Sequence, residues 1–160
     1  MDSIKNIDQL IESTLKDAKT IAMVGVSSVK KEEKSNLVRK PSIIVMNYLQ
    51  EFGYKVIPVN PFALGKKING EDVIGKLEDI NVPVDIVNVF RPSPETVFIA
   101  KQAINIKPKA LWLQYGIQNK EAKSIVESEN IAYIANKCIK QEYQRLFLKI
   151  SPVFPALKNK

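Results

Sequence analysis

The feature that most constrains the fold of this chain is a repeated alternation of short apolar segments with segments of helical periodicity. β-Branched and other apolar residues fill each short segment, and turn-forming residues bound it. Chains that alternate strands with helices in this way build a parallel sheet that helices cover on both faces. We therefore predict an α/β fold with a doubly wound parallel sheet of five strands, which lie within 20–26, 54–60, 84–90, 109–114 and 131–136.

The segments between the predicted strands carry helix-end signals. Gly53 is a C-cap for the helix that follows the first strand, and Ser93 and Pro94 are expected to cap and begin the helix after the third strand. Asn119 is expected to cap a helix that runs to about Glu129. At 160 residues the chain is long enough for one core, so we predict one domain. Its outlying parts are an amphipathic flanking helix at 1–18, a final helix at 138–150 and a tail at 151–160, while 62–77 gives no firm prediction.

The chain has no histidine and a single cysteine, Cys138, and both facts limit its chemistry. The absence of histidine excludes Ser-His-Asp and Cys-His nucleophiles, histidine acid–base catalysis and histidine-ligated metals. One cysteine cannot form an intramolecular disulfide, and we expect no metal site. Cys138 is expected to be a small apolar filler near a helix start; the less favoured alternative is a reactive thiol that forms a mixed disulfide with a ligand.

The formal net charge of +7 favours acidic partners. Residues 30–40 carry five bases against two acids, and residues 137–160 carry six bases against Glu142. Neither stretch interleaves aromatic residues with bases, so nucleic-acid binding is the least favoured interpretation. The apolar runs are far shorter than the about 20 residues that span a bilayer, and the N-terminus lacks a signal-peptide pattern. We therefore expect a cytoplasmic protein with no membrane contact.

Sheets of this kind bind ligands beyond the carboxyl ends of their strands, near the point where strand order reverses. The first strand ends at Gly25, a basic turn follows, and a helix begins at about Ser42 with free N–H groups that attract anions. The other strands end close to further polar residues and turns. We expect one crevice to be lined by residues 25–28, 60–61, 90–92, 114–116 and 136–137.

A dinucleotide site for NAD is disfavoured at this crevice. Its usual turn is G-x-G-x-x-G, whereas this turn has Gly25 alone, and the second strand ends in Asn60 instead of an acid that would bind the ribose hydroxyls. The basic turn instead suits a nucleotide with more negative charge. A ligand with an additional ribose phosphate would gain from Arg39 or Lys40.

The motifs "IAMVGVSS", "VDIVNVFRPSPET", "KALWLQYGI" and "NKCIKQEYQRL" occur in an order and spacing that resemble the small stand-alone CoA-binding proteins. This group is related to the CoA-binding domain of succinyl-CoA synthetase, and the resemblance runs from about Lys19 to Leu146. It implies a Rossmann-like fold that holds coenzyme A or an acyl-CoA at the crevice. The turn after Gly25 departs from the family pattern, since it is several residues longer and mixed in charge. Arg39, Lys40 and Ser42 correspond more closely to the family than the bases before them.

Each candidate residue has a functional and a structural interpretation. Gly25 either lets a pyrophosphate approach the backbone or makes a tight turn, and Arg91 either holds a phosphate bidentately or pairs with Glu95. Gln114 and Gly116 are candidates for the pantetheine amides, whereas Trp112 is expected in the core. The full set of candidate cofactor-binding residues is Gly25, Val26, Ser27, Ser28, Arg39, Lys40, Ser42, Asn60, Pro61, Phe90, Arg91, Pro92, Gln114 and Gly116.

Three classes of function remain open from the sequence. The favoured hypothesis is a CoA-binding protein, monomeric or homodimeric, that has no evident catalytic residues and acts as a carrier, sensor or regulator. The second is an enzyme for an acyl-CoA or another nucleotide, with Asp85 or Glu142 as the acid–base group. The third is a nucleic-acid-binding module that uses the positive charge.

Overall fold

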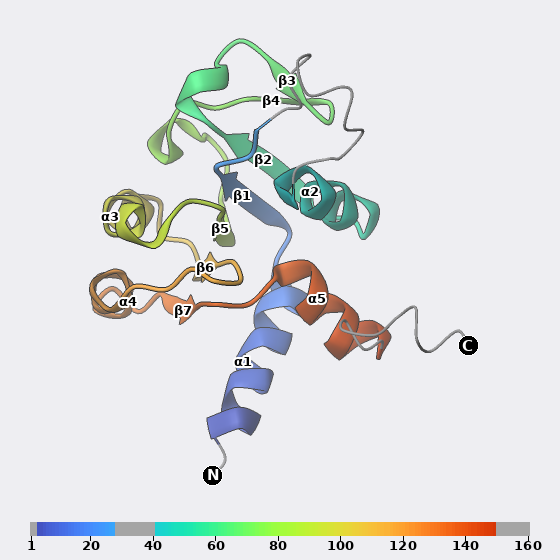
Figure 1. Ribbon diagram of the computed structural model, residues 1–160, viewed down its shortest axis with the longest axis vertical. Coiled ribbons are helices and arrows are strands. Elements are labelled where there is room, and N and C mark those ends of the chain that lie inside the picture. Colours follow the sequence, from blue (N-terminus) through green and yellow to red (C-terminus); the bar gives the residue numbers. More distant parts are fainter. Residues whose placement is uncertain (1–2, 28–40, 150–160) are drawn as a thin grey trace.

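The computed structural model describes residues 3–27 and 41–149 and confirms the predicted α/β class. A five-stranded parallel sheet runs through the centre of the molecule in the order β2-β1-β5-β6-β7 (Figure 1). All five predicted strands are present, and each is shorter than its apolar segment. Their bounds are β1 Thr20–Val24, β2 Lys55–Val59, β5 Ile86–Val89, β6 Ala110–Leu113 and β7 Ala132–Ile134.

Helices cover both faces of the sheet, as a doubly wound fold requires. Figure 1 shows α2 and α5 on one side of the strands and α3 and α4 on the other, while α1 extends from the start of β1. Two separate groups of buried side chains fill the layers between the sheet and these helices. The helices are α1 Ser3–Asp17, α2 Pro41–Glu51, α3 Thr96–Ile106, α4 Lys120–Glu127 and α5 Ile139–Tyr143, the last continuing as a π-helix over Gln144–Leu148.

The strand order reverses between β1 and β5. The chain passes from β1 through α2 to β2 on one side of β1, and then returns to place β5 on the other side. Every later strand adds outward from β5. Ligands of open parallel sheets bind at such a reversal, beyond the carboxyl ends of the two strands, so the residues after Val24 and Val89 are the first to consider.

The segment without a firm prediction forms a small cover over the edge of the main sheet. It contains a one-turn helix, Pro61–Ala63, a two-stranded antiparallel sheet of β3 Lys67–Ile68 and β4 Glu71–Asp72, and a second one-turn helix, Leu77–Asp79. The backbone N–H of Ile74 donates to the carbonyl oxygen of Pro58 at 2.9 Å. Pro58 is tolerated within β2 because its position faces away from β1, where a missing N–H breaks no hydrogen bond of the sheet.

The helix-end predictions have mixed outcomes. Gly53 ends α2 as predicted, with φ of +95° and its N–H donated to Gln50 O, and the side chain of Asn119 caps α4 by accepting from Ala122 N at 2.9 Å. The prediction for Ser93 is wrong. Ser93 begins a one-turn helix, Ser93–Glu95, ahead of α3, and its hydroxyl accepts from Gln118 N at 3.1 Å instead of capping its own helix.

Candidate functional site

The carboxyl ends of β1 and β5 meet at Gly25. Its N–H donates to Val59 O at 3.1 Å, and the Phe90 N–H donates to Val24 O at 2.8 Å, so the turn is held to both neighbouring strands. Gly25 has φ of +96°, and a Cβ atom there would lie 2.9 Å from both Phe90 O and Arg91 Cδ. Only glycine fits this position, because other residues rarely adopt this φ and because Phe90 O and the stem of Arg91 occupy the space of a Cβ atom.

Asn60 connects the end of β2 to the turn after β1. Its side-chain Nδ2 donates to Val26 O at 2.8 Å, and its Oδ1 accepts from Phe62 N at 2.9 Å. Val26 is fully buried, so it offers no accessible surface to a ligand in this structure, whereas Pro61 is exposed. Asn60 therefore fixes the shape of the wall at the β2 end, and its amide has little freedom to contact a ligand.

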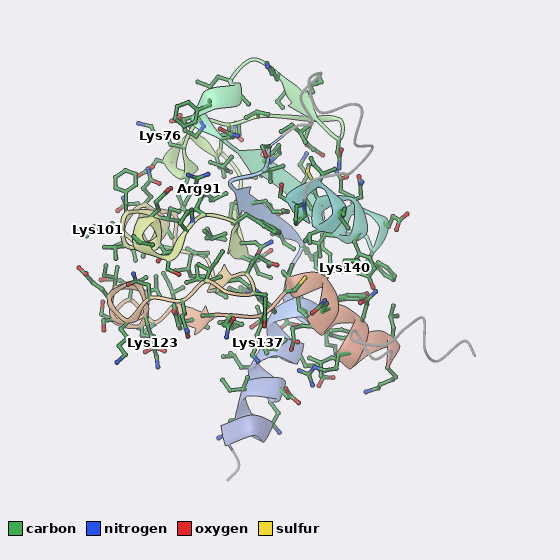
Figure 2. All side chains as sticks on the ribbon, viewed as in Figure 1. Lys76, Arg91, Lys101, Lys123, Lys137 and Lys140 are labelled. Carbon is green, nitrogen blue, oxygen red and sulfur yellow. The ribbon has the colours of Figure 1, made fainter. Side chains whose placement is uncertain are left out.

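Arg91 lies at the end of β5 with its guanidinium bound to Glu95. Its Nε and Nη2 donate to the two carboxylate oxygens of Glu95, each at 2.9 Å. The hydrogen bonds raise the pKa of Arg91 and lower the pKa of Glu95. Arg91 lies near the end of β1 that is farther from α1 (Figure 2), and both side chains are about half exposed. Glu95, the alternative partner that the sequence offers for Arg91, is thus its partner in this structure.

A buried polar pair lies beneath the crevice. Gln114 Nε2 donates to Asn88 Oδ1 at 2.6 Å, and both residues are almost completely buried. Asn88 Nδ2 is itself buried without a hydrogen-bond partner. Gln114 is only 4% exposed, so little of its side chain can be reached by a ligand, although the bond to Asn88 uses only one of its donors. Asn88 is not predictable as a partner of Gln114, because a single polar residue inside an apolar strand does not indicate its hydrogen-bond partner.

The remaining candidates differ in accessibility. Gly116 is exposed, but its N–H donates to Asn136 Oδ1 at 2.7 Å, while Ser42 is buried in the first turn of α2. Ser27 and Phe90 are half-buried and Pro92 is exposed. The predictions for Ser28, Arg39 and Lys40 lie outside the described residues. The described candidates that are exposed or half-buried are therefore Gly25, Ser27, Asn60, Pro61, Phe90, Arg91, Pro92 and Gly116.

The two acid–base candidates lie in unsuitable places. Asp85 lies before β5, at the amino end of the strands, where its carboxylate accepts from Lys19 N at 2.8 Å and Thr20 N at 3.0 Å. Glu142, in α5, accepts from Arg145 Nη2 at 2.6 Å. Asp85 thus ties β1 to β5 at the edge opposite to the crevice. Both hydrogen bonds use the same carboxylate oxygen, Oδ2.

Trp112 and Cys138 both lie at the connection between β7 and α5. Trp112 is fully buried, which confirms its core assignment, and its Nε1 donates to Lys137 O at 2.8 Å. Cys138 is a half-buried free cysteine at the position that precedes α5. The indole N–H therefore holds the β7–α5 connection against β6.

A cavity of about 300 Å³ lies elsewhere, at the amino end of the strands. The ends of α1 and α2 and the aromatic rings of Phe52, Tyr54, Tyr143 and Phe147 line it. It contains none of the predicted cofactor-binding residues.

Within the described ranges 3–27 and 41–149, no helix combines the length and the apolar character needed to cross a membrane.

The order of strands and the helices on both faces of the sheet define a Rossmann-like α/β protein whose strand order reverses between β1 and β5. The family model of the CoA binding domain matches residues 19–144, which include the whole sheet and α5. The chain belongs to this CoA binding domain family.

Relatives support the same assignment over nearly the full domain. The uncharacterized protein YneT of Bacillus subtilis (strain 168) is 34% identical over 133 residues, which cover 81% of this chain and 89% of YneT. The structure of cell-free ID.343 from Thermus thermophilus is 35% identical with a TM-score of 0.77, over 88% of this chain and 98% of that chain. A hypothetical protein from Pyrococcus horikoshii OT3 is 32% identical with a TM-score of 0.77, over 87% and 91% of the two chains.

Proposed function

We propose that this protein binds coenzyme A or an acyl-CoA at the carboxyl edge of its sheet. The observation that carries the proposal is the match of the CoA binding domain family across residues 19–144, because it includes every strand and the glycine turn of the crevice. The geometry at Gly25 agrees with this, since the strand order reverses there and α2 begins on the far side of the basic turn.

We assign the phosphates, the adenosine and the pantetheine arm of CoA to different residues along this edge. Its phosphates would lie at the start of α2 and near Arg91, which offer N–H groups and positive charge. The adenosine would lie beside Asn60 and Pro61, since the end of the second strand receives the ribose in sheets of this type. The pantetheine arm would then extend past Pro92 toward Gly116. This orientation assigns a place to each chemical class of group in the ligand.

The contacts of the two acid–base candidates favour a protein that binds its ligand without catalysing a reaction. Asp85 is engaged at the opposite edge and Glu142 is bound to Arg145, so neither is free as an acid–base group. We therefore favour a carrier, sensor or regulator of CoA or acyl-CoA that works in the cytoplasm. An enzyme on an acyl-CoA remains the alternative class.

Native mass spectrometry of the protein as purified, followed by calorimetric titration, tests the proposal. We expect a co-purifying CoA or acyl-CoA mass, or tighter binding of CoA than of NAD and ATP. Dephospho-CoA should bind more weakly than CoA if the additional phosphate contacts the basic part of the crevice. Binding of NAD or ATP alone would overturn the proposed ligand and would limit the family match to the fold.

A further inference from the structure

Arg91 is fixed at both ends of its side chain. Its stem packs on Gly25, where an added Cβ atom would lie 2.9 Å from Arg91 Cδ and 3.2 Å from Cγ. Its head is held by Glu95 through two hydrogen bonds of 2.9 Å. An arginine side chain normally has considerable rotamer freedom, which costs free energy when a ligand orders it. In this structure, packing on Gly25 and the two bonds to Glu95 favour one orientation of the Arg91 guanidinium.

Glu95 occupies only one side of the guanidinium. The carboxylate accepts from Nε and Nη2, so the end formed by Nη1 and the second N–H of Nη2 is not used by this pair. That end has the fork shape that a phosphate accepts bidentately. The hydrogen-bonding capacity for a phosphate is therefore retained, whereas the negative charge of Glu95 offsets part of the attraction that Arg91 would exert on a phosphate.

We propose that Glu95 is the residue that limits the affinity of this site for phosphate-bearing ligands, because it neutralises the arginine at the reversal of strand order. The inference rests on the proposed function, in which Arg91 contacts a phosphate of CoA. A phosphate that approaches Arg91 meets a carboxylate on the neighbouring edge of the same guanidinium. The ligand must share the arginine with Glu95 or displace it, and either event weakens binding compared with a free arginine.

Glu95 can be replaced without a change in the hydrophobic core, so its effect on binding can be measured separately from stability. Glu95 closes the one-turn helix that precedes α3, and it is exposed and outside both groups of core side chains. Its replacement therefore changes the charge at Arg91 without changing the packing of the sheet. Glutamine keeps one side-chain oxygen that accepts from Arg91 and replaces the other oxygen by an NH2 donor, so Glu95→Gln removes the negative charge together with one of the two hydrogen bonds.

Calorimetric titration of CoA into wild type, Glu95→Gln and Glu71→Gln tests the inference. Glu71 pairs with Lys55 on the small cover and not at the crevice, so Glu71→Gln is a control with the same change in net charge. We expect Glu95→Gln to bind CoA roughly two- to fivefold more tightly than wild type, the range of a partly exposed charge pair. We expect Glu71→Gln to bind like wild type.

The same titration in an Arg91→Met background shows whether Glu95 acts through Arg91. Methionine retains an apolar stem over Gly25 and removes the guanidinium, so Glu95→Gln should then lose most of its effect. Equal or weaker CoA binding by Glu95→Gln in the wild-type background would overturn the inference and make Glu95 a residue that only positions Arg91. An undiminished gain in the Arg91→Met background would overturn it as well. Failure of every variant, wild type included, to bind CoA would instead reject the proposed function.

Discussion

Gly25 combines two separate demands on a single residue. Its φ of +96° favours glycine, and the space that a Cβ atom would need is taken by Phe90 O and Arg91 Cδ. The sequence leaves two interpretations of this glycine, the close approach of a pyrophosphate or a tight turn without a ligand. The contact with Arg91 and the Phe90 backbone could not be predicted, because a pair of residues separated by 66 positions in the chain leaves no local signal of its contact.

Gly25→Ala should therefore destabilise the protein more than a change of backbone freedom alone explains. We expect a loss of roughly 2–4 kcal/mol in the free energy of unfolding, from left-handed strain together with overpacking. Gly65→Ala is the matched control, because Gly65 has φ of +84° and nothing within 4 Å of an added Cβ. It should cost only about 1–2 kcal/mol. Equal losses in urea unfolding would show that packing on Arg91 contributes nothing.

The Asn88–Gln114 pair gives a second prediction for individual residues. Gln114→Leu leaves the buried Oδ1 of Asn88 without its donor and should cost about 1–3 kcal/mol. The double variant with Asn88→Leu removes both polar groups, and it should be less destabilised than the sum of the two single variants. Urea unfolding of the four proteins measures this coupling. Additive losses would mean that the hydrogen bond between the two amides has no net effect on stability.

At the scale of elements, Tyr54 joins the end of α1 to the start of β2. Its hydroxyl donates to Leu15 O at 2.6 Å, and burial raises the pKa of Tyr54 to about 12 from an ordinary value of 10.0. Because the folded pKa lies above the unfolded one, the resulting stability is complete below pH 10 and is lost as the pH rises from about 10 to 12. The contact thus makes the docking of α1 sensitive to strong alkali.

Tyr54→Phe should remove this part of the pH dependence. We expect the free energy of unfolding of wild type to fall more steeply between pH 10 and pH 12 than that of Tyr54→Phe, although the variant is less stable at pH 8 because it lacks the hydrogen bond. Tyr115→Phe serves as the control, since Tyr115 is 78% exposed. Parallel pH curves for wild type and Tyr54→Phe would contradict the assignment.

Helix ends followed the sequence where their signals were local. Gly53 and Asn119 satisfy backbone groups within a few residues of themselves, so their types and positions suffice to predict them. Ser93 failed because its hydroxyl serves Gln118, 25 residues away. The final helix also departs from expectation, since it becomes a π-helix at Gln144, where the aromatic ring of Tyr143 packs on Phe52 and Phe147. Such packing depends on elements that only the folded chain brings together.

For the whole molecule, bound CoA should stabilise the fold by mass action. A ligand that binds only the folded state at 100 times its Kd adds about 2.7 kcal/mol to the free energy of unfolding. We expect CoA to raise the thermal midpoint, and a short oligonucleotide at the same concentration and physiological salt to leave it unchanged. An increase with the oligonucleotide that declines steeply with added salt would instead favour the nucleic-acid interpretation of the positive charge.

The architecture was predictable from the sequence to a greater extent than the site. Alternating apolar and helical segments determine the parallel sheet and its carboxyl edge, because both follow from pattern and connectivity. The state of Arg91 does not follow from pattern, since the same guanidinium can pair with Glu95 or hold a phosphate, and the sequence alone does not decide between them. The candidates in the basic turn, Ser28, Arg39 and Lys40, stay predictions.

Pro58 has a consequence for how this protein behaves at high concentration. The outer strand of a sheet is a template on which another chain can add a strand, and that is a route to aggregation. In β2 the outward position at Pro58 has no N–H to offer, and its carbonyl oxygen is already bonded to Ile74. Together with the small cover formed by β3 and β4, this proline makes one margin of the sheet a poor start for edge-to-edge polymerisation.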